Sequence, residues 1–215
     1  VMPTLNRGQS VLLDLGANVV CDAENLVQFA VMGAAYAQVS IGVENPTVGL
    51  LNVGVEDLKG NDIVQEAHKI LRTMNLGDAE YIGFVEGDDI QKGSCDVIVT
   101  DGFTGNVALK TTEGLARLIQ EYIRRAFRNS IFGMLAYAIG FRRLQKLREQ
   151  LDPRQYNGAV FVGLNGISVK SHGGTDAIGF ANAIKVAAKL YRQGFLDTIS
   201  NRLELADAQI GTTDA

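Results

Sequence analysis

A short apolar run that ends in a polar corner recurs along this chain and limits its fold more than any other feature. In the clearest copy, Val97-Ile98-Val99 stops at Asp101-Gly102 and leads into a long helical pattern. Similar corners follow apolar runs at residues 14–18, 52–56, 86–89 and 163–166. Strands that alternate with helices predict an α/β fold, a three-layer α/β/α domain with a mainly parallel sheet.

The same patterns give the expected elements. Strands are predicted at 10–15, 48–53, 81–85, 95–100 and 158–164, with an extended piece at 167–170. Helices are predicted at 22–38, 60–74, 104–129, 131–150 and 175–193. We expect a single domain over residues 1–200, with a helical hairpin at about 117–152 and a frayed tail over 201–215.

The polar corners predict a ligand site. The carboxyl ends of parallel strands line the crevice of an open α/β sheet, so five such ends are expected to form one composite site. Glycines let backbone N–H groups approach a ligand, and a helix start adds free donors and the positive end of its dipole. This combination favours an inorganic oxyanion, and a plain strand-to-helix turn is the alternative at each corner.

Two clusters add charged groups. His172 precedes Gly173-Gly174 at a helix start, where it is a candidate general acid/base or the cap of a turn. Lys59-Gly60-Asn61 would bring a lysine to the site, although helix capping alone explains Asn61. His68 has polar neighbours and is expected at the surface. The chain has no Walker sequence, no Gly-x-Gly-x-x-Gly after a strand and no Gly-x-Ser-x-Gly elbow.

Composition narrows the class of protein further. Cys21 and Cys95 lie in or beside apolar stretches, so we expect buried free thiols in a reducing compartment. Neither has a second Cys or a His at metal-binding spacing, so no metal site is expected. We also expect no signal peptide and no membrane span, because no apolar run reaches about 18–20 residues.

A basic region stands out in a chain of net charge −4. Residues 117–154 carry nine Arg/Lys against three Asp/Glu, on both sides of the apolar stretch 131–141. That stretch would cover only about 16 Å as a helix, too short to cross a bilayer. It is either an apolar tip that enters anionic lipid or a helix pair buried in a dimer interface, and both can hold in one dimer.

Several of these motifs together resemble one family. The chain closely resembles the bacterial phosphate acyltransferases of phospholipid synthesis from about residue 10 to about 195, over the carboxyl-terminal two-thirds of that family. These enzymes move a fatty acyl group from acyl carrier protein to inorganic phosphate. The motifs that carry the resemblance are residues 13–18, 26–33, 48–54, 59–61, 101–114 and 171–174.

The resemblance implies a fold similar to phosphate acetyltransferase and the isocitrate dehydrogenase superfamily, a homodimer, no organic cofactor, and a cytoplasmic protein attached peripherally to the inner face of the cell membrane. No nucleic-acid partner is expected. Because acyl carrier protein is acidic, the basic region is a candidate docking surface for it as well as for anionic lipid. The docking candidates are Arg124, Arg125, Leu135, Ile139, Arg142, Arg143 and Lys146.

We hypothesise that phosphate attacks the thioester directly, because neither cysteine has a base nearby. His172, Lys110, Asn106 and Lys59 are the candidate catalytic residues, with His172 moving the proton and the lysines offsetting phosphate charge. Backbone N–H groups of Gly102–Asn106 and Gly173–Thr175 are candidates for binding phosphate and the oxyanion. The remaining candidates for phosphate or substrate binding are Asn18, Asn61, Asp101, Gly102, Thr104, Gly105, Asn165, Lys170, Gly173, Gly174 and Thr175.

Three other classes stay open at this point. A phosphate acetyl- or butyryltransferase would use a coenzyme A thioester in place of the carrier protein. A nicotinamide-dependent dehydrogenase of the same superfamily would need a cluster of metal-binding aspartates on a helix, which the sequence does not show. A non-enzymatic membrane-docking module would bind lipid but no phosphate.

Overall fold

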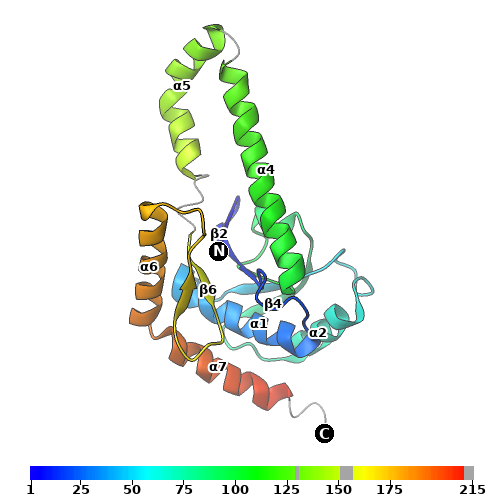
Figure 1. Ribbon diagram of the computed structural model, residues 1–215. Helices are drawn as coiled ribbons and strands as arrows, with labels where there is room; N and C mark the ends of the chain where they lie inside the picture. Colours follow the sequence, from blue (N-terminus) through cyan, green and yellow to red (C-terminus); the bar gives the residue numbers. More distant parts are fainter. Residues whose placement is uncertain (129–130, 151–156, 211–215) are drawn as a thin grey trace.

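The computed structural model describes residues 1–128, 131–150 and 157–210 of the 215-residue chain, without the side chains of 146–150 and 210 (Figure 1). The strands are β1 (Met2–Thr4), β2 (Gly8–Leu13), β3 (Thr47–Leu51), β4 (Glu80–Val85), β5 (Val97–Val99), β6 (Ala159–Phe161) and β7 (Ser168–Lys170). The helices are α1 (Ala23–Tyr36), the π-helical turn η1 (Ala37–Ile41), α2 (Asp62–Thr73), α3 (Asp89–Lys92), α4 (Gly102–Arg128), α5 (Ile131–Gln150), α6 (Ala177–Arg192) and α7 (Phe195–Ile210).

Five strands form the main sheet in the order β1-β2-β5-β3-β4. β2, β5, β3 and β4 pair in parallel, and only the edge strand β1 runs antiparallel, to β2. The central strand β5 is buried over its whole length, as expected for a parallel strand covered on both faces. The prediction of a mainly parallel sheet is confirmed.

Helices cover both faces of this sheet. Val97 and Val99 belong to the larger core, where they pack with α1, α2 and α7, whereas Ile98 belongs to a second cluster with α3 and the first turns of α4. Small residues let α1 lie close to the sheet: a Cβ on Gly33 would stand 2.6 Å from Cγ1 of Val97. The three-layer α/β/α prediction is confirmed.

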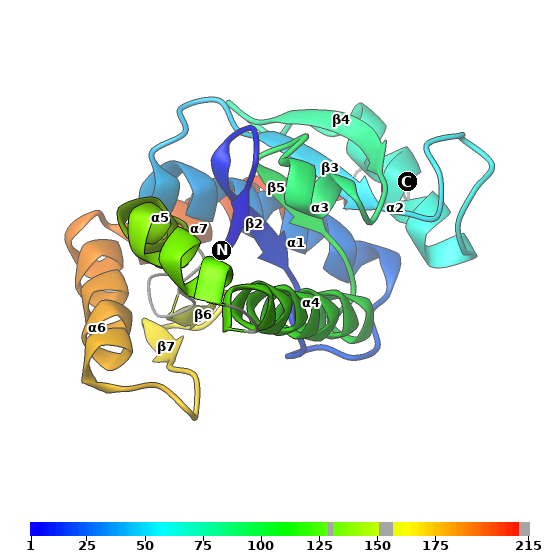
Figure 2. The same cartoon turned by 90° about the horizontal axis from the view of Figure 1, so that it is seen from above.

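Strand β6 does not join the main sheet. It pairs antiparallel with β7 as a separate hairpin, which packs on α6 (Figure 2). The expectation that five strand ends converge is therefore wrong for residues 163–166, because four parallel strands end at the common edge. A short apolar run such as 159–162 reads alike in a hairpin and in a parallel sheet, so the sequence could not separate the two.

Residues 201–210 are helical, contrary to the frayed tail predicted for 201–215. They form the last part of α7, which packs along α1 through the buried side chains of Phe195, Ile199 and Ala206. The Phe195 ring meets Tyr36 edge-on, with centroids 5.7 Å apart. Polar residues between these few apolar positions hide the helical period, and residues 211–215 lie outside the described part.

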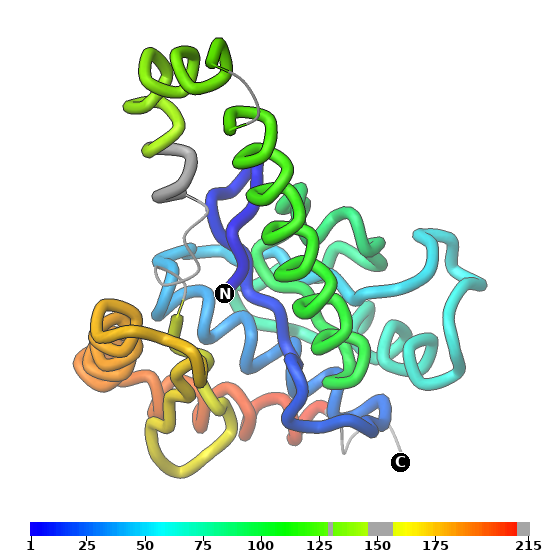
Figure 3. Tube along the Cα trace, turned by 45° about the horizontal axis from the view of Figure 1, so that its top comes forward, coloured from blue at the N-terminus to red at the C-terminus, as the bar shows by residue number. Residues whose placement is uncertain are grey.

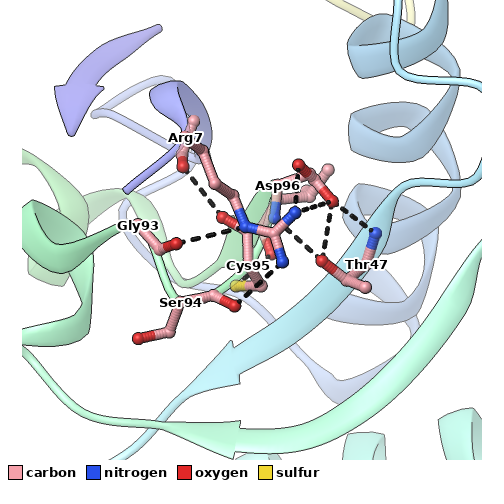
Figure 4. A network of polar contacts seen from close by, with 8 residues as sticks. Arg7, Thr47, Gly93, Ser94, Cys95 and Asp96 are labelled. Carbon is pink, nitrogen blue, oxygen red and sulfur yellow. Dashed lines mark hydrogen bonds and ion pairs between the residues drawn. The ribbon is translucent and has the colours of Figure 1, made fainter. Parts of the chain in front are cut away.

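A polar clamp ties together the amino-terminal ends of three strands, on the side of the sheet opposite the polar corners (Figure 4). Asp96, just before β5, is buried and accepts two hydrogen bonds from Arg7 Nη1, at 2.8 and 2.9 Å. Its Oδ2 also accepts from the backbone N and the hydroxyl of Thr47, at 2.9 and 2.7 Å. This fully bonded carboxylate fixes the register of β2, β3 and β5.

Helices α4 and α5 form the predicted hairpin, which extends away from the sheet (Figures 1 and 3). The two helices contact each other through Phe127 and Tyr137, whose ring centroids are 5.8 Å apart. Within the described residues, the helices lack the combination of length and hydropathy that crossing a bilayer requires.

Candidate active site

A cleft of about 810 Å³ lies at the carboxyl-terminal edge of the parallel sheet. Its walls are largely apolar and come from α4, from the segments that follow β3 and β4, and from α2. Polar groups gather where the strands end, at Asn52, Thr100, Asp101 and Thr104. The volume falls within the usual range for small-molecule sites, about 300–1,000 Å³. The sequence predicts a ligand site at these strand ends.

The hydrogen-bond donors at the corner between β5 and α4 already have acceptors within the protein. Asp101 caps α4, because its Oδ1 accepts from the Thr104 backbone N at 2.8 Å and its Oδ2 from the Thr104 hydroxyl at 2.6 Å. The Gly105 N–H reaches the Asp101 carbonyl at 3.0 Å, and the Gly102 N–H reaches the Asn18 carbonyl at 2.8 Å. Asp101 and Thr104 line the cleft.

The corner between β2 and α1 is built around the buried carboxylate of Asp14. It accepts from the backbone N–H groups of Gly16, Ala17 and Asn18 at 2.8, 3.0 and 2.6 Å, and from Asn18 Nδ2 at 3.0 Å. This corner packs tightly on the start of α4, since a Cβ on Gly105 would stand 1.8 Å from the Asp14 carbonyl oxygen.

These bonds correct one part of the predicted site. We expected bare N–H groups across Gly102–Asn106, but the amides of Gly102, Thr104 and Gly105 already have acceptors. The carboxylates of Asp14 and Asp101 stand where an incoming anion would otherwise find donors. The sequence shows a glycine-bearing corner but does not show that the preceding aspartate bends back onto it.

The connection from β3 to α2 borders the cleft with Gly60 and Asn61. Asn52 Nδ2 donates to the Lys59 carbonyl at 2.9 Å and closes the neck of this loop. Gly60 has φ +98°, and a Cβ there would stand 2.4 Å from Asn52 Oδ1, so the backbone needs glycine. Asn61 caps α2 by accepting from Val64 N at 2.9 Å. Lys59 is exposed and lies directly beside the cleft lining.

Lys110 and Asn106 lie on α4, both exposed. The Lys110 ammonium is 2.9 Å from Glu113 Oε2, so a carboxylate already offsets its charge. Asn106 faces the β2 corner, with its Cβ 3.5 Å from where a Cβ on Gly16 would stand. The cleft lining contains neither residue.

The loop from β7 to α6 carries His172, Gly173, Gly174 and Thr175. His172 Nδ1 accepts from the Gly174 N–H at 3.2 Å, and the His172 carbonyl accepts from the Thr175 N–H at 3.1 Å. Asp176 then caps α6 by accepting from the N–H groups of Ile178 and Gly179. The expected bare donors at this helix start are thus largely occupied, as at α4. The neutral ring carries its proton on Nε2, because Nδ1 accepts.

The candidates on the β6–β7 hairpin and the loop that follows it do not line the cleft. Asn165 lies between β6 and β7, and Lys170 ends β7, so both belong to the separate hairpin. Among the described residues that line the cleft are Asn61, Asp101 and Thr104 from the predicted set, but not His172, Lys170 or Asn165. The catalytic roles of the predicted residues stay predictions.

Comparison with known proteins agrees with the fold and the corners. Residues 1–198 match the family model described as fatty acid synthesis protein. The chain belongs to this family. It is 52% identical over 210 residues to the phosphate acyltransferase of Rhodospirillum rubrum, covering 98% of this chain and 59% of that protein. It is 54% identical to the Rhodospirillum centenum phosphate acyltransferase and 49% identical to that of Agrobacterium fabrum, over 97% of this chain in each case and 58% and 59% of those proteins. The chain thus spans about three-fifths of these relatives.

Within this family member, both cysteines are buried free thiols, as predicted. Burial raises the pKa of Cys95 to about 12, and it also raises the pKa of Cys21. Cys21 lies at the β2 corner, with Sγ 3.4 Å from the Asn18 carbonyl oxygen. A protonated thiol is a poor nucleophile, which favours chemistry without an acyl-cysteine. In the described residues, His, Cys, Asp and Glu side chains form no group of three that could hold a metal ion.

The docking candidates lie on the α4–α5 hairpin. Arg124 and Arg125 both pair with Glu121, at 2.7 and 2.8 Å, so part of their charge is balanced. Arg142, Arg143, Leu135 and Ile139 are exposed, with Ile139 at 81%. The side chain of Lys146 lies outside the described residues.

Sequence reasoning missed Asn157 and misplaced His68. Asn157 is buried, accepts from the His172 N–H at 2.9 Å, and donates to the Ser171 hydroxyl and the Gly179 carbonyl at 2.9 and 2.8 Å. It therefore shapes the His172 loop. The only signal in the sequence was an Asn-Gly pair, which is common in turns. His68 is 7% exposed, so the expected surface position is wrong.

Proposed function

We propose that the complete protein transfers a fatty acyl group from acyl carrier protein to inorganic phosphate and releases an acyl phosphate for glycerophospholipid synthesis. The name of the relatives, phosphate acyltransferase, supports the reaction class. The observation that carries the proposal is the cleft, whose apolar walls end at polar strand corners. The walls suit an acyl chain, and the polar groups at the strand ends suit its thioester.

In the proposed reaction a phosphate oxygen attacks the thioester carbonyl, the C–O bond forms, and the C–S bond breaks. The sulfur of the carrier protein leaves as a thiolate and takes up the proton that the attacking phosphate gives up, and no acyl-enzyme forms. The acyl group moves from sulfur to a phosphate oxygen without oxidation or reduction, so the proposed reaction needs no organic cofactor. Catalysis then consists of holding phosphate beside the carbonyl and stabilising the oxyanion.

A lysine offsets the phosphate charge in this scheme. Because aspartates occupy several corner amides, we assign phosphate binding to Lys59, which is exposed beside the cleft lining, together with the remaining donors at the helix starts. Asn18 and Asn106, which lie at the β2 corner, orient the carbonyl. His172 moves the proton through Nε2, since its Nδ1 accepts from the Gly174 N–H.

The decisive assay uses the complete protein with palmitoyl-acyl carrier protein and labelled phosphate. The proposal expects phosphate-dependent release of carrier protein with equimolar labelled acyl phosphate. Equal or better turnover with acetyl- or butyryl-coenzyme A, and indifference to carrier protein, would favour a coenzyme A-dependent transferase. Absence of turnover and of phosphate binding, with lipid binding retained, would favour a non-enzymatic docking module.

The role of His172 has its own test. Loss of one group that stabilises a transition state costs about a hundredfold in rate or more, so His172→Ala should lose about that much turnover in the complete protein. Tyr191→Ala is the matched control, because it removes a ring that is 79% exposed on α6, the helix that the His172 loop leads into. Nearly full turnover in His172→Ala would refute the proton-transfer role.

For the α4–α5 hairpin we propose docking at an anionic membrane surface on the cytoplasmic side, with acyl carrier protein guided by the same basic residues. Its support is the exposure of Ile131, Phe132 and Ile139, at 80%, 84% and 81%, beside exposed Arg142 and Arg143. A homodimer that covers part of this surface is the second candidate, and the same exposed apolar side chains favour it.

Liposome sedimentation separates the two. Leu135→Glu with Ile139→Glu should release the complete protein from vesicles that contain anionic phospholipid while its circular dichroism stays unchanged. Leu205→Glu, at a position that is 67% exposed on α7 and outside the hairpin, is the charge control. Unchanged sedimentation together with loss of the dimer in analytical ultracentrifugation would assign the surface to the second copy.

A further inference from the structure

One buried histidine lies outside the proposed chemistry and has an incomplete set of hydrogen bonds. His68 lies on α2, with its ring stacked on Phe84 at a centroid distance of 4.2 Å and an interplanar angle of 24°. Its Nδ1 is 2.6 Å from the Tyr81 hydroxyl oxygen on β4. Its Nε2 is buried and has no hydrogen-bond partner among the described residues.

The protonation of this pair defines what Nε2 offers. Burial lowers the pKa of His68, with a smaller contribution in the same direction from Arg72 on the same helix, so the ring is neutral at neutral pH. Burial also raises the pKa of Tyr81, so the phenol keeps its proton and can donate to Nδ1. The proton of the ring then sits on Nε2, which becomes a buried donor without an acceptor.

An acceptor stands just out of reach. Asp57 Oδ1 is 3.9 Å from His68 Nε2, and the Asp57 side chain is 78% exposed. A normal N–H···O bond has its heavy atoms about 2.9 Å apart, so a shift of about 1 Å would form one. A buried unpaired donor favours any state of the protein that supplies this acceptor.

Asp57 belongs to the loop that carries Lys59. The Lys59 N–H donates to the Glu56 carbonyl at 3.0 Å, so residues 56–59 form one closed turn. The neck of the loop is fixed by Asn52 at the Lys59 carbonyl, whereas Leu58 at the tip is 96% exposed. A movement that brings Asp57 to His68 therefore repositions the turn that leads into Lys59.

We propose that Asp57 and His68 are positioning residues, and that phosphate binding at Lys59 draws the turn inward so that Asp57 accepts a hydrogen bond from His68 Nε2. The inference rests on the proposed function, because that function assigns Lys59 to phosphate. The pair does not touch the reacting atoms. It stabilises the loop position in which the lysine meets the anion, and so it acts on phosphate affinity.

The first test measures phosphate affinity in the complete protein by calorimetry. Loss of a hydrogen bond to a charged group corresponds to about a tenfold change, so Asp57→Ala should raise the phosphate Kd by about tenfold. Asp57→Asn keeps an acceptor oxygen and should restore most of the affinity. Glu66→Ala removes an exposed carboxylate from α2 and should change nothing. In turnover, Asp57→Ala should raise the phosphate KM and leave kcat at saturating phosphate within about twofold.

The second test observes the histidine directly. In complete protein labelled with ¹⁵N-histidine, the His68 ring signals are assigned by their loss in His68→Gln. Addition of inorganic phosphate should shift the Nε2–H signal downfield and slow its exchange with water, and Asp57→Ala should abolish both changes. A structural role confined to the fold would not produce this response to phosphate.

The outcomes separate the two proposals. Phosphate that binds equally well to Asp57→Ala, or that binds without moving the His68 signal, overturns the positioning role and leaves the transferase proposal standing. Failure of the complete protein to bind phosphate at all overturns the proposed function, and the positioning role falls with it.

Discussion

Gly105 offers the sharpest test of how the cleft is built. A Cβ at this position would stand 1.8 Å from the Asp14 carbonyl oxygen, against about 3.4 Å for ordinary contact, so Gly105→Ala must push α4 away from the β2 corner by about 1.6 Å. Overpacking of this kind costs about 1–3 kcal/mol, and loss of the Gly102–Asn18 hydrogen bond adds about 1 kcal/mol. We expect a loss of about 3 kcal/mol in the free energy of unfolding.

The same helix provides the control. A Cβ on Gly114 would meet nothing within 4 Å, so Gly114→Ala should stabilise the protein by about 0.5–1 kcal/mol through helix propensity. Urea unfolding followed by far-UV circular dichroism measures both variants, since the chain has no tryptophan. The difference should approach 4 kcal/mol. If Gly105→Ala unfolded at the wild-type urea midpoint or above it, the interlocked corner described here would be refuted.

Three polar groups give further predictions by the same unfolding assay. Asp96→Asn breaks the buried clamp and should lower the free energy of unfolding by about 3 kcal/mol, whereas Glu66→Gln at an exposed ion pair should lower it by less than about 1 kcal/mol. Similar losses in the two variants would contradict the stabilising role of the clamp. Because burial lowers the pKa of His68, the unfolded state binds a proton that the folded state does not, so the free energy of unfolding should fall as pH drops below about 6.5. His68→Gln should flatten this dependence of stability on pH. An unchanged dependence in His68→Gln would exclude His68 as its cause. Asn157→Ala should lose about 2 kcal/mol and Asn165→Ala less than about 0.5 kcal/mol, and a stable Asn157→Ala protein would show that the His172 loop does not depend on this amide.

Periodicity is enough to predict the layers and the polar corners at one edge of the sheet. The apolar runs before Asp14, Asn52 and Asp101 are parallel strands, because a strand that is buried on both faces needs a continuous apolar sequence. The corners that follow these strands lie at one edge of the sheet. The long α4–α5 hairpin also follows from its pattern. Strand β6 was assigned to the wrong sheet because three apolar residues carry no information about their partner.

The details of the site depend on contacts that no local pattern encodes. Asp14 and Asp101 bend back onto their own corners and occupy amides that the sequence presented as free. His68 has polar neighbours in sequence, yet the helix turns it onto Phe84 and Tyr81 of β4, which are 13 or more residues away. Asn157 acts through partners up to 22 residues away, so its role becomes visible only in three dimensions.

The central claim is that the cleft beside α4 holds the acyl chain. Val107 lines this cleft and is 48% exposed, so Val107→Trp narrows it with little effect on folding. The direct measurement is acyl phosphate formation by the complete Val107→Trp protein with palmitoyl- and octanoyl-acyl carrier protein. We predict that kcat/KM falls by about tenfold or more for the palmitoyl donor and by less than about twofold for the octanoyl donor. Equal kcat/KM changes for the two donors would place the acyl chain elsewhere.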